Sequence, residues 1–196
     1  RDYYLPTTKY QKNQVYLGCD VGVDVLHVVV LEKLADEKMR LIWAGTVHNF
    51  FGPMDSLERI IEMYGVRYGV IDKKPETSQV RKMVETYPGR IYAASYPNMK
   101  FSVKDYYIYD DVRYEVQIDR TTSLDYLIND IQNQRLELPA NVGMIDGFYD
   151  QLLSSVRVTD RNKKTGVDQA KWLEKGADHY LHTLNYARIA QIRGVV

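Results

Sequence analysis

The segment from residue 67 to residue 96 constrains the fold of this chain more than any other. Its two ends, RYGVID at 67–72 and RIYAASY at 90–96, have β character, and apolar residues recur at helical spacing between them: Val80, Met83, Val84 and Tyr87. A strand, a helix and a second strand in this order require parallel strands joined by a right-handed crossover. The near-continuous apolar character of RYGVID is that of a strand covered on both faces. The segment therefore predicts a sheet with a parallel centre and helices on its faces.

Three β-like segments precede the crossover, at residues 15–20, 25–33 and 41–49. The short polar separations between them predict antiparallel neighbours. A helix could begin at Pro53, and it is predicted to end at Gly65, because apolar residues follow Pro53 at the spacing of one helical stripe: Leu57, Ile60, Ile61 and Tyr64.

The second half of the chain adds a ribbon and more helices. The tyrosine-rich run 106–109, a turn of two aspartates and the run 112–118 predict a β-ribbon attached to the core. Thr121 or Thr122 is expected to cap the next helix. The remaining expected elements are a short extended piece at 136–138, a helical stripe at 145–153, β character at 156–159, a charged loop at 160–166 and a C-terminal helix from 177 to about 193.

This order of elements is that of the ribonuclease H-like fold. We therefore predict an α/β protein whose central mixed sheet has five or more strands, is flanked by helices and carries an added β-ribbon. The strand at 15–20 should lie parallel to and beside the strand at 67–72, with 90–96 beyond it. A chain of 196 residues with 45% hydrophobic and 27% charged residues is ordinary for one globular domain.

Three aspartates are predicted to converge in this fold. Asp20 closes the first strand in GCDVGVD, Asp72 closes the strand 67–72, and Asp178 lies in the first turn of the last helix. The carboxyl edge of a parallel sheet is where ligands of α/β proteins usually bind. Taken singly, each aspartate is more simply a turn former or a helix N-terminal residue, but their combination in this order favours a site.

Convergent carboxylates repel one another, so a fold keeps them where a cation compensates their charge. Oxygen ligands favour Mg²⁺ or Mn²⁺, and a pair of such ions activates water and stabilises a leaving oxygen in phosphodiester cleavage. Asp20 is expected at the centre of the sheet, between the other two aspartates, and is therefore the predicted ligand that both ions share. The sequence therefore points to nuclease chemistry.

The last helix also carries two histidines. His182 shares a helix face with Asp178 and could support a metal ligand or bind a phosphate. His179 is the next residue after Asp178 and therefore points to a different side of the helix. A partly buried histidine with a satisfied hydrogen bond explains each of them equally well. Neither is expected to bind zinc, because no further His or Cys cluster accompanies them. Cys19 alternates to the face opposite Asp20 and is expected to pack in the core.

The charge balance limits contacts with nucleic acid to local patches. The 26 Lys and Arg residues equal the 26 Asp and Glu residues, so the chain has no overall basic surface. Two basic clusters are predicted to contact phosphates near the carboxylates: Lys73 and Lys74, directly after Asp72, and Arg161, Lys163 and Lys164 in the charged loop. A merely solvated surface explains the second cluster equally well.

Four blocks of the sequence resemble the nuclease domain of the large terminase subunit of tailed bacteriophages. They are YLGCDVGVD, YGVIDKKPETSQVRKMVETYPGRIYAASY, VQIDRTTSLDYLINDIQNQRLELP and KGADHYLHTLNYARIA. The resemblance implies a metal-dependent endonuclease that cuts concatemeric viral double-stranded DNA during packaging in the host cytoplasm. It also implies one or two Mg²⁺ or Mn²⁺ ions, with ligands from the first strand, the fourth strand and the C-terminal helix, which match Asp20, Asp72 and Asp178.

The resemblance further implies partners: an ATPase motor domain, the portal and the small terminase subunit. Residues 1–14 read as a linker from such a motor, and residues 15–196 as the nuclease domain. No GxxxxGK[ST] motif of a motor occurs in the chain. No apolar stretch approaches 18 residues and the start resembles no signal or transit peptide, so a soluble protein without membrane contact is expected.

One motif departs from the family. Many relatives carry Asp-His-x-x-Asp-Ala in the last block, whereas this chain has Asp178, His179, and then His182 and Thr183. The departure leaves three acidic ligands where those relatives have four.

Three other functions fit parts of the pattern. A Holliday-junction resolvase would be a self-sufficient dimer. An actin-like or sugar-kinase phosphotransferase needs a Gly/Thr-rich loop after the first aspartate and a second domain, whereas Val23, Asp24 and Val25 follow Gly22 here. A silent module that only docks DNA or the portal would bind no divalent metal.

Overall fold

The computed structural model describes residues 14–34, 38–99, 101–102, 105–161, 166 and 168–194. Most of the predicted linker, together with Lys163 and Lys164, lies outside these residues. In chain order the elements are β1 (Val15–Val21), β2 (Leu26–Lys33), β3 (Met39–Val47), α1 (Leu57–Tyr64), β4 (Tyr68–Asp72), α2 (Thr77–Thr86), β5 (Ile91–Ser95), β6 (Tyr107–Asp110), β7 (Glu115–Ile118), α3 (Arg120–Gln132), β8 (Leu136–Glu137), the 3₁₀ helix η3 (Val142–Met144), α4 (Phe148–Leu153), β9 (Ser155–Arg161), β10 (Asp168–Glu174) and α5 (His179–Arg193).

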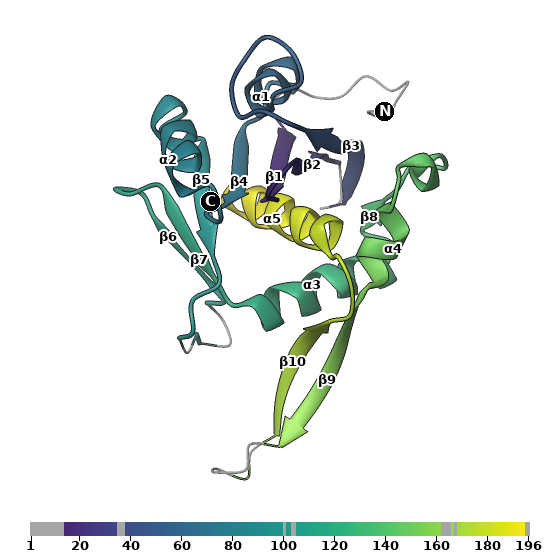
Figure 1. Ribbon diagram of the computed structural model, residues 1–196. Helices are drawn as coiled ribbons and strands as arrows, with labels where there is room; N and C mark the ends of the chain where they lie inside the picture. Colours follow the sequence, from purple (N-terminus) through teal and green to yellow (C-terminus); the bar gives the residue numbers. More distant parts are fainter. Residues whose placement is uncertain are drawn as a thin grey trace.

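The central sheet has the predicted topology. Its eight strands follow the order β6-β7-β5-β4-β1-β2-β3-β8 (Figure 1). Strand β1 pairs in parallel with β4 and antiparallel with β2, and β4 pairs in parallel with β5. The ribbon β6–β7 joins the same sheet, because β7 pairs in parallel with β5. The predicted α/β fold with a mixed central sheet is confirmed.

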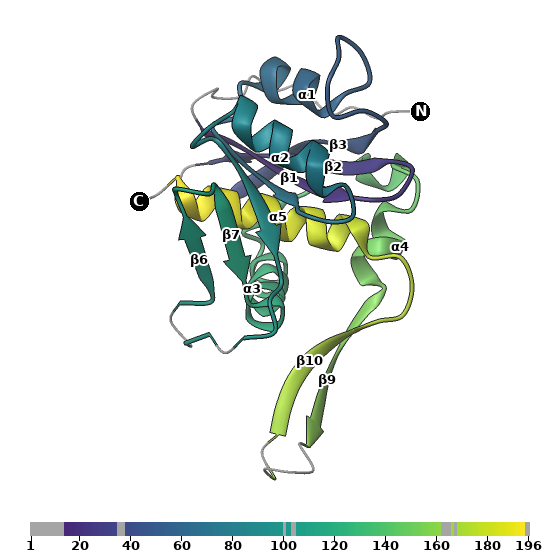
Figure 2. The same cartoon turned by 60° about the vertical axis from the view of Figure 1, so that its left-hand side comes forward.

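Helices cover both faces of this sheet (Figure 2). On one face, alternate side chains of β1, including Leu17 and Cys19, pack with apolar residues of α1 and α2. The core position expected for Cys19 is confirmed, since its side chain is fully buried. On the other face α5 crosses β1, β2 and β4, and α3 and α4 contact α5 from outside. Every residue of β1 is buried, as expected of a central strand covered on both faces.

Helix α5 lies directly on the backbone of β1, and Gly18 makes this possible. A Cβ atom at position 18 would overlap the carbonyl oxygen of Thr183 and would lie 2.5 Å from the backbone nitrogen of Ala187. The absence of a side chain at one position therefore sets the height of α5 above the sheet, and with it the distance between Asp20 and the start of α5.

Two helix starts differ from the prediction. Helix α1 begins at Leu57, four residues after Pro53, because the Ser56 side chain accepts a hydrogen bond from the Arg59 backbone N–H at 3.2 Å. Helix α3 is capped by Asp119 and not by Thr121 or Thr122. The Asp119 carboxylate accepts from the Thr122 N–H at 2.7 Å and so captures a free backbone donor of the first turn.

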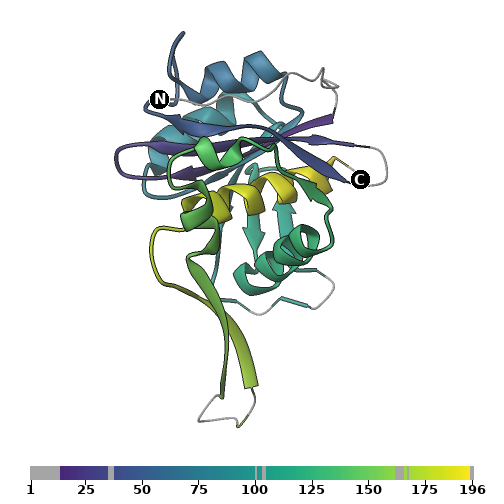
Figure 3. The ribbon, with the colours of Figure 1, turned by 90° about the vertical axis from the view of Figure 1, so that its right-hand side faces the viewer.

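A two-stranded hairpin, β9–β10, projects from the body of the molecule (Figure 3). The sequence analysis places only a charged loop before the last helix and does not predict β10. The reason is that DQAKWLE alternates poorly, because most of its residues are exposed on both faces of the ribbon. Its β conformation comes from pairing with β9, from Asp168 opposite Arg161 to Glu174 opposite Ser155.

Among the described residues no helix is long and apolar enough to cross a lipid bilayer.

Candidate metal centre

Asp20 and Asp72 lie side by side on the α5 face of the sheet. The register of β1 and β4 pairs Cys19 with Ile71, so the two aspartates are the next residues of adjacent parallel strands. Cys19 and Ile71 pack into the core beneath α1 and α2, so their neighbours project to the opposite face. Adjacent strands lie about 4.8 Å apart. The fold thus brings the carboxylates of Asp20 and Asp72 together.

The charge of Asp72 is poorly compensated. Its pKa is raised to about 6, chiefly by burial and also by the charge of Asp20, whereas the backbone N–H of Lys74, 3.2 Å from Oδ1, the charge of His182 and the Tyr186 hydroxyl lower it. Among the described residues no lysine or arginine side chain pairs with Asp72. Two adjacent carboxylates in a partly buried site, with His179 beside Asp20 but no lysine or arginine partner among the described residues, fit a hard divalent ion.

His27, which the sequence analysis does not single out, lies on the other side of Asp20. In the antiparallel pair β1–β2, Asp20 and His27 are direct partners, so their side chains share a face. His27 is 8% exposed, and burial together with the neighbouring His179 lowers its pKa to about 4. The signal in the sequence is weak, because His27 is one polar residue at the start of the apolar run LHVVVL.

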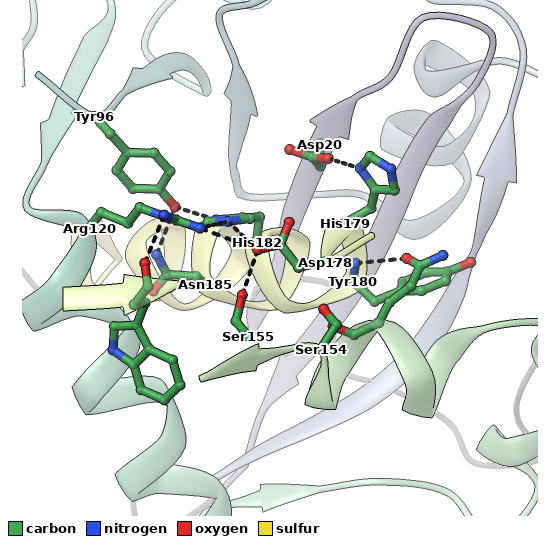
Figure 4. Close-up of polar contacts among 12 residues, drawn as sticks. Asp20, Tyr96, Arg120, Ser154, Ser155, Asp178, His179, Tyr180, His182 and Asn185 are labelled. Atoms are coloured by element: carbon green, nitrogen blue, oxygen red, sulfur yellow. Dashed lines mark hydrogen bonds and ion pairs between the residues drawn. The ribbon is translucent and has the colours of Figure 1, made fainter. Parts of the chain in front are cut away.

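His179, the first residue of α5, contacts Asp20 from above the sheet. Its Nδ1 lies 2.7 Å from Oδ2 of Asp20 (Figure 4). This hydrogen bond raises the pKa of His179. The His179 ring stacks on that of His27, with centroids 4.3 Å apart and an interplanar angle of 15°. One ligand atom each of Asp20, His27 and His179 lie within 4.8 Å of one another, and this is the group of potential metal ligands that the described residues contain.

Asp178 lies apart from this group and is already neutralised by protein donors. Its Oδ2 accepts a hydrogen bond from Ser155 Oγ at 2.8 Å and lies 3.2 Å from both Arg120 Nη2 and His182 Nε2 (Figure 4). Burial alone would raise the pKa of Asp178, but the hydrogen bonds from His182 and Ser155 and the charge of Arg120 outweigh burial and lower it. The predicted trio is therefore divided: Asp20 contacts His179 and Asp72 has no lysine or arginine partner among the described residues, whereas Asp178 belongs to an ion-pair network with Arg120.

His182 sits inside that network. It is 8% exposed, its Nδ1 lies 2.9 Å from the Tyr96 hydroxyl, and its Nε2 faces both Asp178 and Arg120. The Tyr96 hydroxyl also accepts a hydrogen bond from Asn185. These contacts fit both interpretations of His182, a buried histidine with satisfied hydrogen bonds and a support for Asp178, so its role stays a prediction. Arg120, which the sequence analysis missed, is marked only by its place directly after the capping Asp119.

The predicted basic residues are dispersed. Lys74 is exposed beside Asp72, but Lys73 alternates to the other face, where its Nζ lies 2.8 Å from Glu115. Arg161 ends β9, whose first residue contacts Asp178, so it lies about 20 Å along the strand from the site. The hairpin thus carries Arg161 away from the carboxylates, where the sequence analysis had expected it to be near them.

Replacing Asp72 by asparagine is expected to stabilise the metal-free protein. A pKa of about 6 in the folded state against an ordinary value of 3.8 means that folding favours protonated Asp72, so the wild type loses stability as pH rises from about 4 to about 6. At pH 7 the variant should gain about 2–3 kcal/mol, and at pH 4 it should gain almost nothing. Urea unfolding in EDTA at both pH values measures this. An equal gain at both pH values would contradict the charge explanation.

Comparison with known proteins finds a similar fold but no similar sequence. No family model and no curated protein matches the chain. Among solved structures, the large terminase nuclease from the thermophilic phage G20c superposes with a TM-score of 0.54 at 16% identity, over 95% of this chain and 90% of that one.

Two further solved structures are more distant. The nuclease domain of the large terminase of bacteriophage SPP1, solved with bound Mn, gives a TM-score of 0.46 at 14% identity, over 89% of this chain and 84% of that one. A yeast mitochondrial Holliday junction resolvase gives a TM-score of 0.46 at 8% identity, over 96% of this chain and 82% of that one. The superposition on the phage G20c terminase nuclease shows that the resemblance of the sequence blocks extends to the three-dimensional fold.

Proposed function

We propose that this chain, which shares the fold of a large terminase nuclease, is a divalent-metal-dependent endonuclease that cuts double-stranded DNA. The observation that carries the proposal is the pair Asp20 and Asp72 at the ends of two central parallel strands. Their side chains share one face, and the raised pKa of Asp72 reflects its burial and the charge of Asp20. A fold keeps such a pair where a cation is to be bound.

The residues of this chain have distinct roles in the proposed reaction. Asp20 and Asp72 would hold Mg²⁺ or Mn²⁺, which when bound supplies activation of water and neutralisation of charge on the cleaved phosphodiester. His179 holds one oxygen of Asp20 in place through its 2.7 Å contact. Arg120, with Ser155 and His182, fixes the carboxylate of Asp178 at the start of α5. Asp178 would complete the ligand set only by giving up part of this network or through its second oxygen.

The biological setting that we propose is the packaging of viral DNA. The sequence blocks that resemble terminase nuclease domains support cutting of concatemeric double-stranded DNA in the host cytoplasm. In that setting residues 15–196 act as the nuclease domain, and residues 1–14 lead from an ATPase motor that works with the portal and the small terminase subunit.

Cleavage of supercoiled plasmid by the purified chain tests the function. Relaxed and linear products should form with Mn²⁺ or Mg²⁺ and should vanish with EDTA. Asp72→Asn should lower the rate at least about 100-fold, since it removes one of the two carboxylates proposed to hold the ion. Asp24→Asn, an exposed change in the turn after β1, serves as the matched control and should cut normally. A four-way junction cut in strong preference to plasmid would favour a resolvase, and a chain that neither binds a divalent metal nor cuts DNA would be a docking module.

DNA contacts are expected to be to phosphates and to be weak in the isolated chain. With zero net charge, only local patches such as Lys74 and the basic run that includes Lys163 and Lys164 are available. The dissociation constant should lie at roughly 10⁻⁴ to 10⁻⁶ M, and replacing Lys163 and Lys164 together by glutamine should weaken binding equally on unrelated duplexes. Each lost phosphate contact should reduce the salt slope by about one. Fluorescence anisotropy on two duplexes measures both effects; a strong preference for one duplex would contradict phosphate tracking.

A further inference from the structure

A nitrogen donor flanks Asp20 on the side opposite Asp72. Because the strand order is β4-β1-β2, Asp72, Asp20 and His27 form a row across three neighbouring strands on the α5 face. Asp20 therefore stands between an oxygen donor from β4 and a nitrogen donor from β2. The two sides of Asp20 differ in the kind of ion that they suit.

The nitrogen side has the geometry of a binding position. One ligand atom each of Asp20, His27 and His179 lie within 4.8 Å of one another. The ring of His27 is held by stacking on His179 and by an edge contact with Tyr180 at 5.2 Å. The side chain of His179 is 37% exposed, so the group is open to solvent on the side of α5.

His27 also carries an unexplained buried nitrogen. Although the residue is 92% buried, its Nδ1 has no hydrogen-bond partner among the described residues. An unsatisfied buried polar atom is destabilising, so a fold seldom keeps one without a reason. Coordination of a cation at Nδ1 would give this nitrogen the partner that the described residues do not.

We propose that Asp20, His27 and His179 form a nitrogen-rich cation position beside the oxygen-rich position of Asp20 and Asp72. The position takes a late first-row divalent ion such as Zn²⁺ or Co²⁺, because imidazole nitrogen suits these ions and carboxylate oxygen suits Mg²⁺ and Mn²⁺. This inference rests on the proposed function only in treating Asp20 as a metal ligand. Neither His179 nor His182 was expected to bind zinc, because the sequence shows no further His or Cys cluster beside them; the β1–β2 register brings His27, from far earlier in the chain, next to His179.

Titration calorimetry of the metal-free chain with Zn²⁺, Co²⁺ and Mg²⁺, without DNA, tests the proposal. His27→Phe keeps a ring against His179 but removes the nitrogen donors. It should weaken Zn²⁺ and Co²⁺ binding at least about 10-fold and change Mg²⁺ binding by less than about 3-fold. His48→Phe is the matched control, because His48 is exposed and pairs only with Asp55, and it should leave all three affinities unchanged.

A second measurement covers the case in which His27→Phe fails to fold. In the wild type labelled with ¹⁵N-histidine, Zn²⁺ should shift the ring nitrogens of His27 and His179 and leave those of His48 in place. Unchanged Zn²⁺ affinity in folded His27→Phe, or an unshifted His27 nitrogen at saturating Zn²⁺, would overturn the proposal.

The outcome is separable from that of the proposed function. If the chain binds Zn²⁺ through His27 but does not cut DNA with any divalent ion, the proposed nuclease function is overturned and this inference stands. A chain that cuts with Mg²⁺ and binds Zn²⁺ without His27 does the reverse.

Discussion

Asp20→Asn is expected to abolish metal-dependent DNA cleavage and to leave the fold intact. Asp20 stands between Asp72 on one neighbouring strand and His27 on the other, and its Oδ2 contacts His179 from α5. Removing its charge therefore weakens every cation position that the site can form. We expect a loss of at least about 1,000-fold in cleavage rate, equivalent to about 4 kcal/mol in the barrier. Plasmid cleavage under single-turnover conditions with saturating Mn²⁺ measures it.

The fold should survive because asparagine has nearly the size of aspartate and can still hydrogen-bond to His179. Circular dichroism and urea unfolding of the variant serve as the check on structure. Asp24→Asn, four residues away in an exposed turn, controls for a general change in charge near β1. Cleavage by folded Asp20→Asn at the wild-type rate would remove Asp20 from the site and with it the proposed chemistry.

Gly18→Val is expected to prevent the native fold from forming. The new Cβ would overlap the Thr183 carbonyl oxygen and crowd the backbone nitrogen of Ala187 at 2.5 Å. Both atoms belong to the backbone of α5, so no rotamer change relieves the contact and the whole helix must lift from β1. Even Gly18→Ala should cost more than about 3 kcal/mol, beyond the usual range for overpacking by small groups. The free energy of unfolding in urea measures the loss.

Gly176→Ala is the matched control for this prediction. A Cβ atom there would meet only the Ser154 side chain, at 3.9 Å, which is ordinary contact. Its free energy of unfolding should change by less than about 1 kcal/mol. If Gly18→Ala were as stable as Gly176→Ala, close packing of α5 on β1 would not be what holds the start of α5 over Asp20.

The sequence by itself determined the order and pairing of the central strands. The apolar runs at 67–72 and 90–96 and the helical stripe between them permit only a parallel crossover, which the pairing of β4 with β5 confirms, and the order of elements, that of the ribonuclease H-like fold, places the strand of Asp72 beside that of Asp20. Helix α5 was visible in the same way, from its apolar spacing. These features are local or follow from chirality rules, so they can be obtained without knowing what packs against what.

The tertiary structure alone decided which polar groups meet. Asp178 lies at the predicted start of α5, yet its partners Arg120 and Ser155 come from α3 and β9, and they neutralise a carboxylate that spacing alone assigned to the metal. His27 faces Asp20 only because of the β1–β2 register. The hairpin strand β10 exists because β9 pairs with it, not because of its own pattern. Such contacts join residues far apart in sequence, and no periodicity along the chain encodes them, because they depend on the register of strands and on the height at which Gly18 lets α5 rest on the sheet.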